Sequence, residues 1–485
     1  MEYRLTERTV GEHDASERGP LAALAELAPR HGRAWLVGGA VRDELLGRST
    51  PDLDLAVQGD VRALARELGR AAGGHAFQLS DTFGAWRVRA HDQTWQVDLM
   101  PLVGETLEQD LRRRDLTINA IARELDVDSG GFIDPCGGVA DLRARRLRSV
   151  AREAFSEDPL RVLRLVRFAV ELDFEVERET FALASASAPA LAGVASERVF
   201  TELRLMLVCD RAVAGVELCQ RIGATAVVLP ELDALRGLVQ SDYHHLDVYE
   251  HTLATLQATI ELARDPTAIF GPELAPALTA VLDEPLANEL TRGQTLRIGA
   301  LMHDIAKPLT HAVNAEGRPT FFRHDERGAE LTTQILNRLR ASERLVSHVA
   351  ALTRNHLRLG FLVHERPLPP RAVYQYLASC EPVPVDVTVL SVADRLATRG
   401  RNAERAISLH LELARELLPA ALAWRTNRPR PPIAGDRLAQ ATGMTPGPQL
   451  GRLLSELAEA AYAGEVAGEE QILAHARRWL ATEAR

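Results

Sequence analysis

The order of apolar and polar positions changes character along the chain, and the first hundred residues carry the pattern of strands. Short apolar runs bounded by turn residues predict strands at 34–37, 53–57, 85–89 and 95–100. Helices are predicted between them, at 41–46 and 60–72. Short strands that alternate with helices in this way predict a small mixed β-sheet with helices.

The pattern turns helical from Asp158 onward, with apolar residues at three- and four-residue spacing through 195–219. A long helix is predicted at 400–423, and Pro and Arg residues at 427–432 mark a linker. The stretch 265–291 is rich in Pro, Gly and Asp and is predicted to be less ordered. The predicted fold class is therefore α+β, a small N-terminal mixed sheet followed by all-helical parts.

These shifts of pattern divide the chain into five predicted parts. They are an N-terminal extension (1–30), a head with the mixed sheet (31–150), a helical neck and body (151–235), a helical module (236–400) and a helical tail (401–485). A chain of 485 residues is too long for one hydrophobic core, and its length predicts roughly three or four domains.

Composition and cysteine spacing indicate a protein of the reduced cytosol. The four cysteines form no Cys-x-x-Cys pair, so neither a zinc ribbon nor a disulfide framework is predicted. The first twenty residues lack the apolar centre of a secretory signal, and no later run approaches the ~20 apolar residues of a membrane span. We therefore expect a cytoplasmic location and no membrane partner.

The net charge of −10 argues against indiscriminate nucleic-acid binding, but basic residues cluster locally. The clusters lie at 112–114, 143–148 and 161–167. Local positive potential is what meets a phosphate backbone. Any RNA is therefore expected to bind to the first half of the chain.

The most informative motif of the head is a glycine pair followed by two alternating aspartates. Gly38 and Gly39 end the first apolar run and allow close approach of a phosphate at the start of a helix, where Arg42 adds a cationic contact. Asp52 and Asp54 alternate on a short strand, so both side chains point to the same face. Two such carboxylates can chelate Mg²⁺, the ion that phosphoryl transfer needs.

A second motif follows in the same half of the chain. The segment 110–120 contains Arg113, Arg114, Asp115 and Asn119. Taken singly, the glycine turn, the alternating aspartates and the arginine run are each more typical of an ordinary turn, an acidic strand end and a solvated helix face. Their occurrence in this order in one chain favours a functional interpretation.

Together these segments resemble the class II tRNA nucleotidyltransferase and poly(A) polymerase family of the polymerase-β superfamily. The resemblance implies that the aspartate pair holds metal and triphosphate, and that Arg113, Arg114, Asp115 and Asn119 contact the ribose and phosphates of the nucleotide. It also implies a third catalytic carboxylate from a neighbouring strand, for which Asp98 is the candidate. The implied activity is template-independent addition of C and A to tRNA 3′ ends from CTP and ATP.

Two further segments continue the resemblance. Residues 134–142 resemble the family's connector between head and neck, although an ordinary loop is an equal alternative. Asp158 and Arg161 resemble its base-selecting motif, followed by Arg164 at helical spacing. We predict that Asp158 and Arg161 share one helix face and pair with a base edge, and that Leu163, Val166 and Val170 anchor the opposite face. A simple Asp–Arg ion pair within the helix is the alternative.

One departure from the family concerns the product. Members that build the whole CCA end have a flexible segment between the third carboxylate and the arginine motif, whereas this chain has only residues 99–109 there. The chain is similar in this respect to members that add two C residues, so addition of A is in doubt. The segment 71–82 is an alternative location for such a loop.

The second half carries a different constellation. His251, His303, Asp304 and Asp394 occur in the order of the HD superfamily of metal-dependent phosphohydrolases, and these ligand types suit a divalent metal. The resemblance implies a metal centre that is either an active phosphohydrolase or a scaffold.

Other basic side chains are candidates for the same centre. Lys307 is the only lysine of the chain, and a compact ammonium is not replaceable by guanidinium in a tight phosphate site, so we predict that Lys307 binds phosphate. His324 is a second candidate for phosphate binding. His348 and His356 are further candidates, although a hydrogen-bonded or surface histidine is the commoner situation for each.

The resemblance implies tRNA, CTP and ATP as partners, with a tail that helps to grip tRNA or, read without the family, serves for dimerisation. The sequence leaves the oligomeric state open. Two alternatives to CCA or CC addition also stay open. One is a poly(A) polymerase, and the other is an HD phosphohydrolase whose front half only binds RNA.

Overall fold

The computed structural model describes residues 19–81, 83–125, 131–240, 246–399 and 403–483. Most of the predicted N-terminal extension therefore lies outside the described residues. The described chain divides into two compact units, one of residues up to 194 with 221–224, and one of 195–220 with 225 onward. No helix in the described ranges is long and apolar enough to cross a membrane.

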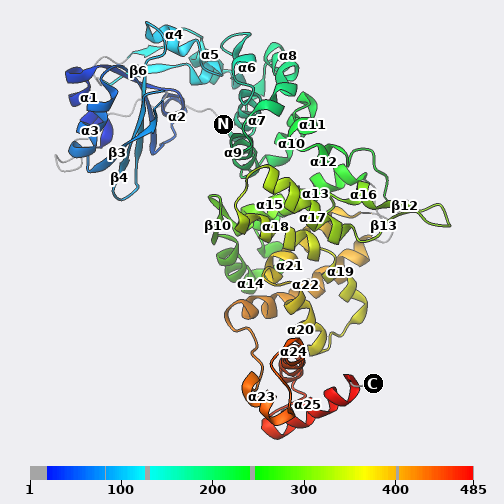
Figure 1. Ribbon diagram of the computed structural model, residues 1–485. Helices are drawn as coiled ribbons and strands as arrows, with labels where there is room; N and C mark the ends of the chain where they lie inside the picture. The colour runs from blue at the N-terminus through cyan, green and yellow to red at the C-terminus, as the bar shows by residue number, and fades with distance from the viewer. Residues whose placement is uncertain (1–18, 82, 126–130, 241–245, 400–402, 484–485) are drawn as a thin grey trace. The chain divides into compact units, whose positions relative to one another are not determined.

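The first unit contains the predicted mixed sheet (Figure 1). Its strands are β1 (Gly32–Val37), β2 (Asp52–Gly59), β3 (Gly74–Ser80), β4 (Ala85–Ala90), β5 (Gln96–Pro101), β6 (Ala122–Glu124) and β7 (Phe132–Ile133), in the order β3-β4-β5-β2-β1-β6-β7. β2 and β5 are parallel, and the other neighbours are antiparallel. The predicted segment 71–82 is largely strand β3 rather than a loop, because 74–80 pair with β4.

Alternation along the strands gives the sheet two different faces. Leu55, Val97 and Val88 point to one face and are fully buried, and helix α3 (Val61–Ala71) packs against β3, β4 and β5. The opposite face carries Val37 and Ala56, which pack with helix α4 (Leu107–Leu111). The aspartates of β2 lie on that second face, toward the start of the strand, where they are exposed.

Glycines allow the chain to pass from the sheet to the neck. Helix α2 (Gly39–Leu45) follows β1 directly, and helix α5 (Gly138–Arg143) packs on the short 3-10 helix η1 (Thr117–Asn119). A Cβ atom on Gly138 would stand 2.1 Å from the carbonyl oxygen of Thr117. The glycines of the connector segment therefore serve close packing, not only a loop.

The neck is helical, as predicted, and its central element is α7 (Arg161–Leu172). Leu163, Val166 and Val170 are buried, which confirms the predicted apolar face. The placement of Asp158 was wrong: it follows helix α6 (Ala154–Glu157) with an extended backbone, φ −143° and ψ 99°, and precedes α7. Pro159 explains the interruption, because the residue before a proline disfavours the helical region.

The second unit is built of helices. Its principal helices are α9 (Ser196–Leu207), α13 (Val248–Arg264), α14 (Thr267–Leu282), α15 (Arg292–Met302), α17 (His324–Arg338), α18 (Glu343–Asn355), α20 (Pro370–Ser379), α21 (Pro384–Ala397) and α22 (Ala403–Thr426). α22 confirms the long helix predicted after residue 400. The tail contains α23 (Gly435–Thr442), α24 (Pro448–Tyr462) and α25 (Glu469–Glu483) around a core of its own.

The prediction of a less ordered stretch at 265–291 was wrong. Most of it forms α14, followed by a hairpin of β10 (Pro285–Ala287) and β11 (Leu290–Thr291). Gly271 breaks the helix with φ 79°, so that Pro272 begins a new helical segment instead of interrupting one. Burial of Leu278 and Leu282 outweighs the poor helix propensity of this composition.

Candidate functional sites

Strand pairing places the carboxylates of the head in one row. Asp54 lies opposite Asp98 in the parallel pair of β2 and β5, and Asp52 precedes it on the same face. Arg87 on β4 lies opposite Asp98 and donates to both of its oxygens, at 2.6 Å from Nε and 2.7 Å from Nη2. The structure therefore brings all three predicted carboxylates together and adds Arg87, whose only sequence signal was its position in a predicted strand.

The electrostatics of this row favour a bound cation. Desolvation raises the pKa of Asp54 although its side chain stays accessible, and the neighbouring charges of Asp98 and Asp52 raise it further. Arg114 acts in the opposite direction. Within the described part of the chain, Asp52 and Asp54 form no ion pair with a basic side chain. Two adjacent carboxylates form a donor set that suits Mg²⁺.

Gly38 lies where only glycine fits. Its φ is +70°, and a Cβ there would stand 2.7 Å from Nη1 of Arg114 and 3.6 Å from Oδ2 of Asp54. Arg114 therefore reaches across the glycine toward the acidic row, and it also pairs with Asp110 at 3.3 Å. Gly39 begins α2. The glycine turn, an arginine and an aspartate from three separate segments thus meet at one point.

The other residues of the arginine motif form a buried network. Asp115 accepts from Nε of Arg164 at 2.7 Å and from Nδ2 of Asn119 at 3.0 Å. Asn119 in turn accepts from Arg42 at 2.9 Å. Burial by itself would raise the pKa of Asp115, but the charge and hydrogen bonds of Arg164 and Asn119 lower it to about 2.

Arg42 is buried and directed into this network. Its guanidinium donates to both oxygens of Asp43 and lies 4.9 Å from the centre of the Phe168 ring. Phe168 also stacks with Arg164 and Arg167, at 5.4 and 4.1 Å. Nothing in the sequence distinguishes Phe168 from an ordinary core residue of α7.

Arg161 links the neck to the arginine motif through backbone oxygens. Its guanidinium donates to the carbonyl oxygens of Arg113 at 2.6 Å and Ala154 at 2.9 Å, and it pairs with Glu157 at 3.7 Å. Asp158 is not on the helix face of Arg161, because it lies outside α7. Arg113 itself is exposed.

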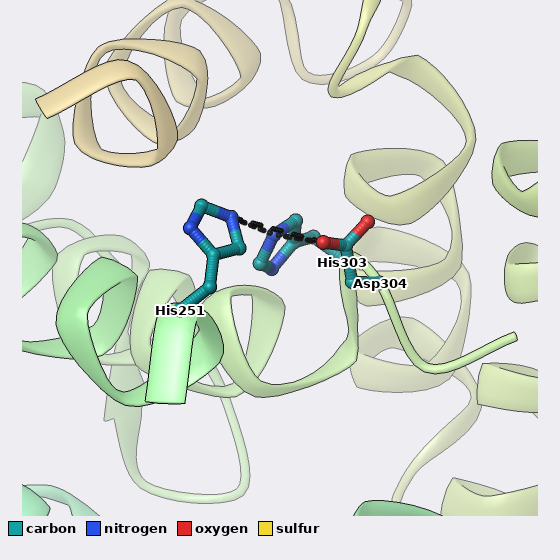
Figure 2. Close-up of side chains that lie close together, drawn as sticks. All are labelled: His251, His303 and Asp304. Carbon is teal, nitrogen blue, oxygen red and sulfur yellow. Dashed lines mark hydrogen bonds and ion pairs between the residues drawn. The ribbon is translucent and has the colours of Figure 1, made fainter. Parts of the chain in front are cut away.

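The second unit brings the predicted histidines and aspartates into a buried cluster. His251 extends from α13, while His303 and Asp304 follow the end of α15, and the three side chains converge (Figure 2). Nε2 of His303 lies 3.2 Å from Oδ2 of Asp304 and 3.4 Å from Nε2 of His251. Asp394 of α21 completes the set, with Oδ1 at 3.0 Å from Nε2 of His251.

Asp304 is shared with a second group of ligand atoms. Its Oδ1 lies 3.3 Å from Nε2 of His324 and 3.8 Å from Nε2 of His356. His348 is elsewhere: it lies 3.5 Å from Asp386, which also pairs with Arg292. Of the three additional histidines considered from the sequence, the structure therefore brings two to the cluster.

Backbone hydrogen bonds orient three of these histidines in the same way. Nδ1 of His303, His324 and His356 lies 2.6–2.8 Å from the carbonyl oxygen three residues earlier. Such a bond fixes the tautomer and leaves Nε2 as the ligand atom, which is the usual arrangement around a protein-bound metal. Burial and the nearby His303 and His324 lower the pKa of His356 to about 4, so this imidazole is neutral.

Lys307 is committed to the cluster itself. Its ammonium lies 2.6 Å from Oδ2 of Asp304 and 2.5 Å from Oε1 of Gln240. Burial alone would raise the pKa of Asp304, but Lys307 and His303 hold it well below its usual range. The predicted contact of Lys307 with phosphate stays a prediction, because these partners already occupy the lysine.

A mixed sheet that presents clustered carboxylates, followed by a helical unit with a His and Asp cluster, defines a nucleotidyltransferase joined to an HD domain. Three family profiles agree with this division. The poly A polymerase head domain matches residues 34–148, a probable RNA and SrmB-binding site of polymerase A matches 173–236, and the HD domain matches 248–399.

Several curated proteins are similar over nearly the whole chain. An A-adding tRNA nucleotidyltransferase of Deinococcus radiodurans is 36% identical over 92% of this chain and 95% of its own length. A CC-adding tRNA nucleotidyltransferase of Thermus thermophilus is 36% identical over 92% and 93%. The chain therefore belongs to the tRNA nucleotidyltransferase family, and the family predicted from its motifs is confirmed.

Solved structures show the same fold. The apo form of a CCA-adding enzyme superimposes with a TM-score of 0.63 at 20% identity, covering 93% of this chain and 92% of that one. A tRNA-processing enzyme gives a TM-score of 0.55 at 24% identity, covering 80% and 96%. These likenesses confirm the predicted architecture of an N-terminal mixed sheet and a helical remainder.

Proposed function

We propose that this enzyme extends tRNA 3′ ends without a template, using CTP and, in the wider family, ATP. The observation that carries the proposal is the row of Asp52, Asp54 and Asp98, which strand pairing assembles beside the glycine turn. Solved CCA-adding enzymes in complex with ATP, with CTP and with tRNA share the fold and support these partners. A tRNA substrate and four free thiols suit the cytoplasm.

Asp52 and Asp54, with Asp98, are the residues that would hold Mg²⁺ in the head. When bound, the ion neutralises the triphosphate and lowers the pKa of the tRNA 3′-hydroxyl that attacks the α-phosphate. The protein's own contribution is placement. The parallel strands fix the aspartates, Arg87 holds Asp98, and the glycine turn admits the phosphates next to Arg114.

Nucleotide recognition is assigned to the neck side of this site. We propose that exposed Arg113 and half-buried Arg114 contact the triphosphate, and that Asp115 and Asn119 contact the ribose. Asp158, Arg161 and Arg164 would then select the base. The network through Asp115 supports this assignment, since it fixes Asn119 and Arg164 before a nucleotide arrives. Arg42, buried behind Asn119, is proposed to position that amide rather than to meet phosphate.

We further propose that addition stops after C residues. The connection from β5 to α4 consists only of residues 102–106, so the flexible segment of members that complete the CCA end is missing at this place. An A-adding relative, which represents the alternative product, is 36% identical to this chain. Sequence identity does not distinguish A addition from CC addition, because a CC-adding relative is also 36% identical.

One assay decides the product. The protein is incubated with Mg²⁺ and tRNA transcripts that end before the CCA, before the second C or before the A, with CTP and ATP singly and together. CC addition gives two residues from CTP alone and none from ATP. Addition of one A to the longest transcript, three residues, or a ladder of A residues would replace this proposal by A addition, CCA addition or polyadenylation.

A paired variant tests the catalytic assignment. Asp52→Ala with Asp54→Ala is expected to abolish incorporation, whereas Asp81→Ala, an exposed aspartate in the same sheet region, is expected to leave it unchanged. Incorporation that survives in the double variant would show that these carboxylates do not form the site.

We propose a second activity, metal-dependent phosphoester hydrolysis, at the histidine cluster. His251 and His303 face one oxygen of Asp304, with Asp394 beside these two histidines, and His324 and His356 face the other oxygen. The residues therefore fit two divalent ions that share Asp304. When bound, such ions supply Lewis acidity and a water of lowered pKa. The titration described next compares four divalent metals at this site.

The metal assignment is tested by calorimetric titration of the metal-free protein with Mn²⁺, Ni²⁺, Co²⁺ and Mg²⁺ in the background lacking Asp52 and Asp54. His303→Ala with Asp304→Ala is expected to abolish binding, and His324→Ala to halve the stoichiometry. His311→Ala, an exposed histidine, serves as control. Unchanged binding in the first variant would exclude a metal centre here.

A further inference from the structure

A large pocket adjoins the histidine cluster. Its volume is about 700 Å³, and its wall includes the ligand residues His324 and Asp394 together with Phe322, Leu409 and Arg395. This volume exceeds what inorganic phosphate fills and suits an organic group of nucleotide size. Phe322 is 83% exposed at this pocket, so the pocket also offers apolar surface to such a group.

Helix α21 presents a polar stripe to the pocket. Ser391 and Arg395 lie four residues apart on one face of α21, and Thr398 follows the end of the helix; all three line the pocket. Most of the remaining residues of α21 are buried apolar side chains. A half-buried guanidinium on this stripe is not explained by the packing of the helix.

The guanidinium of Arg395 lies near Asp394; burial lowers the pKa of Arg395, and the charge of Asp394 raises that pKa less strongly. Within the residues that the structure describes, Nε of Arg395 is buried without a hydrogen bond, and no ion pair of its guanidinium is formed. Withdrawing a charged group from water is unfavourable unless an opposite charge or hydrogen bonds compensate. The buried Nε of Arg395 is therefore a donor that an anionic ligand can satisfy.

Lys307 and His410, two further basic groups of the pocket, are less suited to bind an anion. Lys307 is paired with Asp304 and bonded to Gln240. His410 lies 3.2 Å from Ser391, and burial, assisted by the charge of Arg395, lowers its pKa to about 4, so it is neutral. Arg395 is the arginine of this wall, and its Nε has no hydrogen bond within the described part of the protein.

We propose that Arg395, rather than Lys307, binds the phosphoryl oxygens of a phosphoester whose organic part is of nucleotide size. This assignment rests on the hydrolytic function proposed for the same cluster. The planar guanidinium can donate two parallel hydrogen bonds to phosphoryl oxygens, and its place beside Asp394 sets the phosphorus next to the ligand atoms. Arg395 contributes binding and orientation, and the metal-ligand residues carry the chemistry.

The test uses the full chain in the background lacking Asp52 and Asp54, so that the head does not bind the probes. The probes are inorganic phosphate, followed by calorimetry with Mn²⁺ bound, and bis(p-nitrophenyl) phosphate as the hydrolysed ester. Arg395→Gln is expected to weaken phosphate binding and raise KM by about tenfold to a hundredfold, the loss of a charge-assisted hydrogen-bond pair. Arg395→Lys should recover part of this loss.

Arg399→Gln is the matched control, because this exposed arginine stands one turn further along the chain and the charge change is the same. It is expected to behave like the parent. Mn²⁺ binding by Arg395→Gln is expected to be equal to that of the parent, which reports correct folding of the unit that contains Arg395. If Arg395→Gln does not fold correctly, phosphate binding by Arg395→Lys is compared with that of the parent instead.

The outcomes separate the two proposals. Binding and KM within twofold of the parent in Arg395→Gln, while His303→Ala abolishes hydrolysis, would overturn the role of Arg395 and leave the hydrolase in place. Absence of phosphate binding and of hydrolysis in the parent with all four metals would overturn both. A loss in Arg399→Gln equal to that in Arg395→Gln would reduce the effect to general charge and also overturn the assignment.

Discussion

At the scale of single residues, the head contains a glycine at which an added Cβ atom would collide with a neighbouring side chain. Gly38 combines a positive φ with an arginine nitrogen 2.7 Å from where a Cβ would stand. Gly47 has nearly the same φ, +69°, but nothing within 4 Å. The two glycines therefore separate backbone strain from steric contact.

We predict that Gly38→Ala lowers the rate of CTP incorporation at least about tenfold, because Arg114 must leave the acidic row, whereas Gly47→Ala affects only stability, by about 1 kcal/mol from the unfavourable φ. Single-turnover incorporation and urea unfolding measure the two effects. Equal loss of activity in both variants would assign the effect to strain alone.

The buried pair of Asp115 and Arg164 predicts a dependence of stability on pH. The folded-state pKa of Asp115 is about 2, below its usual value. A lowered carboxyl pKa contributes stability above the unfolded pKa that is lost as pH falls through the folded value. The contribution is roughly 2 kcal/mol at neutral pH.

Asp115→Asn is therefore expected to be less stable than wild type by roughly 2 kcal/mol or more at pH 7, and the difference should shrink as pH falls from about 4 toward 2. Denaturant unfolding at several pH values measures it. Asp173→Asn, which breaks an exposed pair with Arg145, is the control and should change stability by less than about 0.5 kcal/mol. A difference that does not change with pH would contradict the assignment.

At the scale of elements, close packing of short helices fixes the residues that read the nucleotide. Helix α5 lies so near η1 that Gly138 faces the Thr117 carbonyl, and Thr117 donates to Asp141 at 2.7 Å. η1 carries Asn119 into the network of Asp115. The connector segment thereby sets the position of a site residue that it does not touch.

Gly138→Ala is predicted to separate α5 from η1, lowering the free energy of unfolding by about 1–3 kcal/mol or more and weakening CTP binding. Calorimetry and equilibrium CTP binding measure these effects. Gly451→Ala, in α24 with nothing within 4 Å of the added atom, should instead be neutral or stabilising by up to about 1 kcal/mol. Similar losses in both would show that helix propensity, not packing, decides.

At the scale of the whole molecule, the two candidate centres lie in separate compact units. A ligand that binds only the folded state stabilises the unit that binds it. We predict that Mn²⁺ raises the melting temperature of the HD unit in the background lacking Asp52 and Asp54, and that this shift is lost in His303→Ala with Asp304→Ala. Scanning calorimetry with and without chelator measures it, and a shift that persists in the variant would place the metal elsewhere.

The sequence by itself determined the features that depend on local order. Alternation placed Asp52 and Asp54 on one strand face, helical spacing placed the buried side of α7, and motif order identified the family. These features follow from the periods of two residues in a strand and 3.6 residues in a helix, which depend only on residues close together in the sequence.

Tertiary structure decided the rest, because register, helix ends and packing join segments that are distant in sequence. The parallel pairing of β2 with β5 brought Asp98 beside Asp54, and the antiparallel pairing of β4 with β5 brought Arg87 beside Asp98. Pro159 removed Asp158 from its predicted helix face, and burial turned 265–291 into a helix and hairpin. The pairing of Lys307 with Asp304, and the burial of Nε of Arg395 without a hydrogen bond in the described part of the chain, arise only when the helices meet.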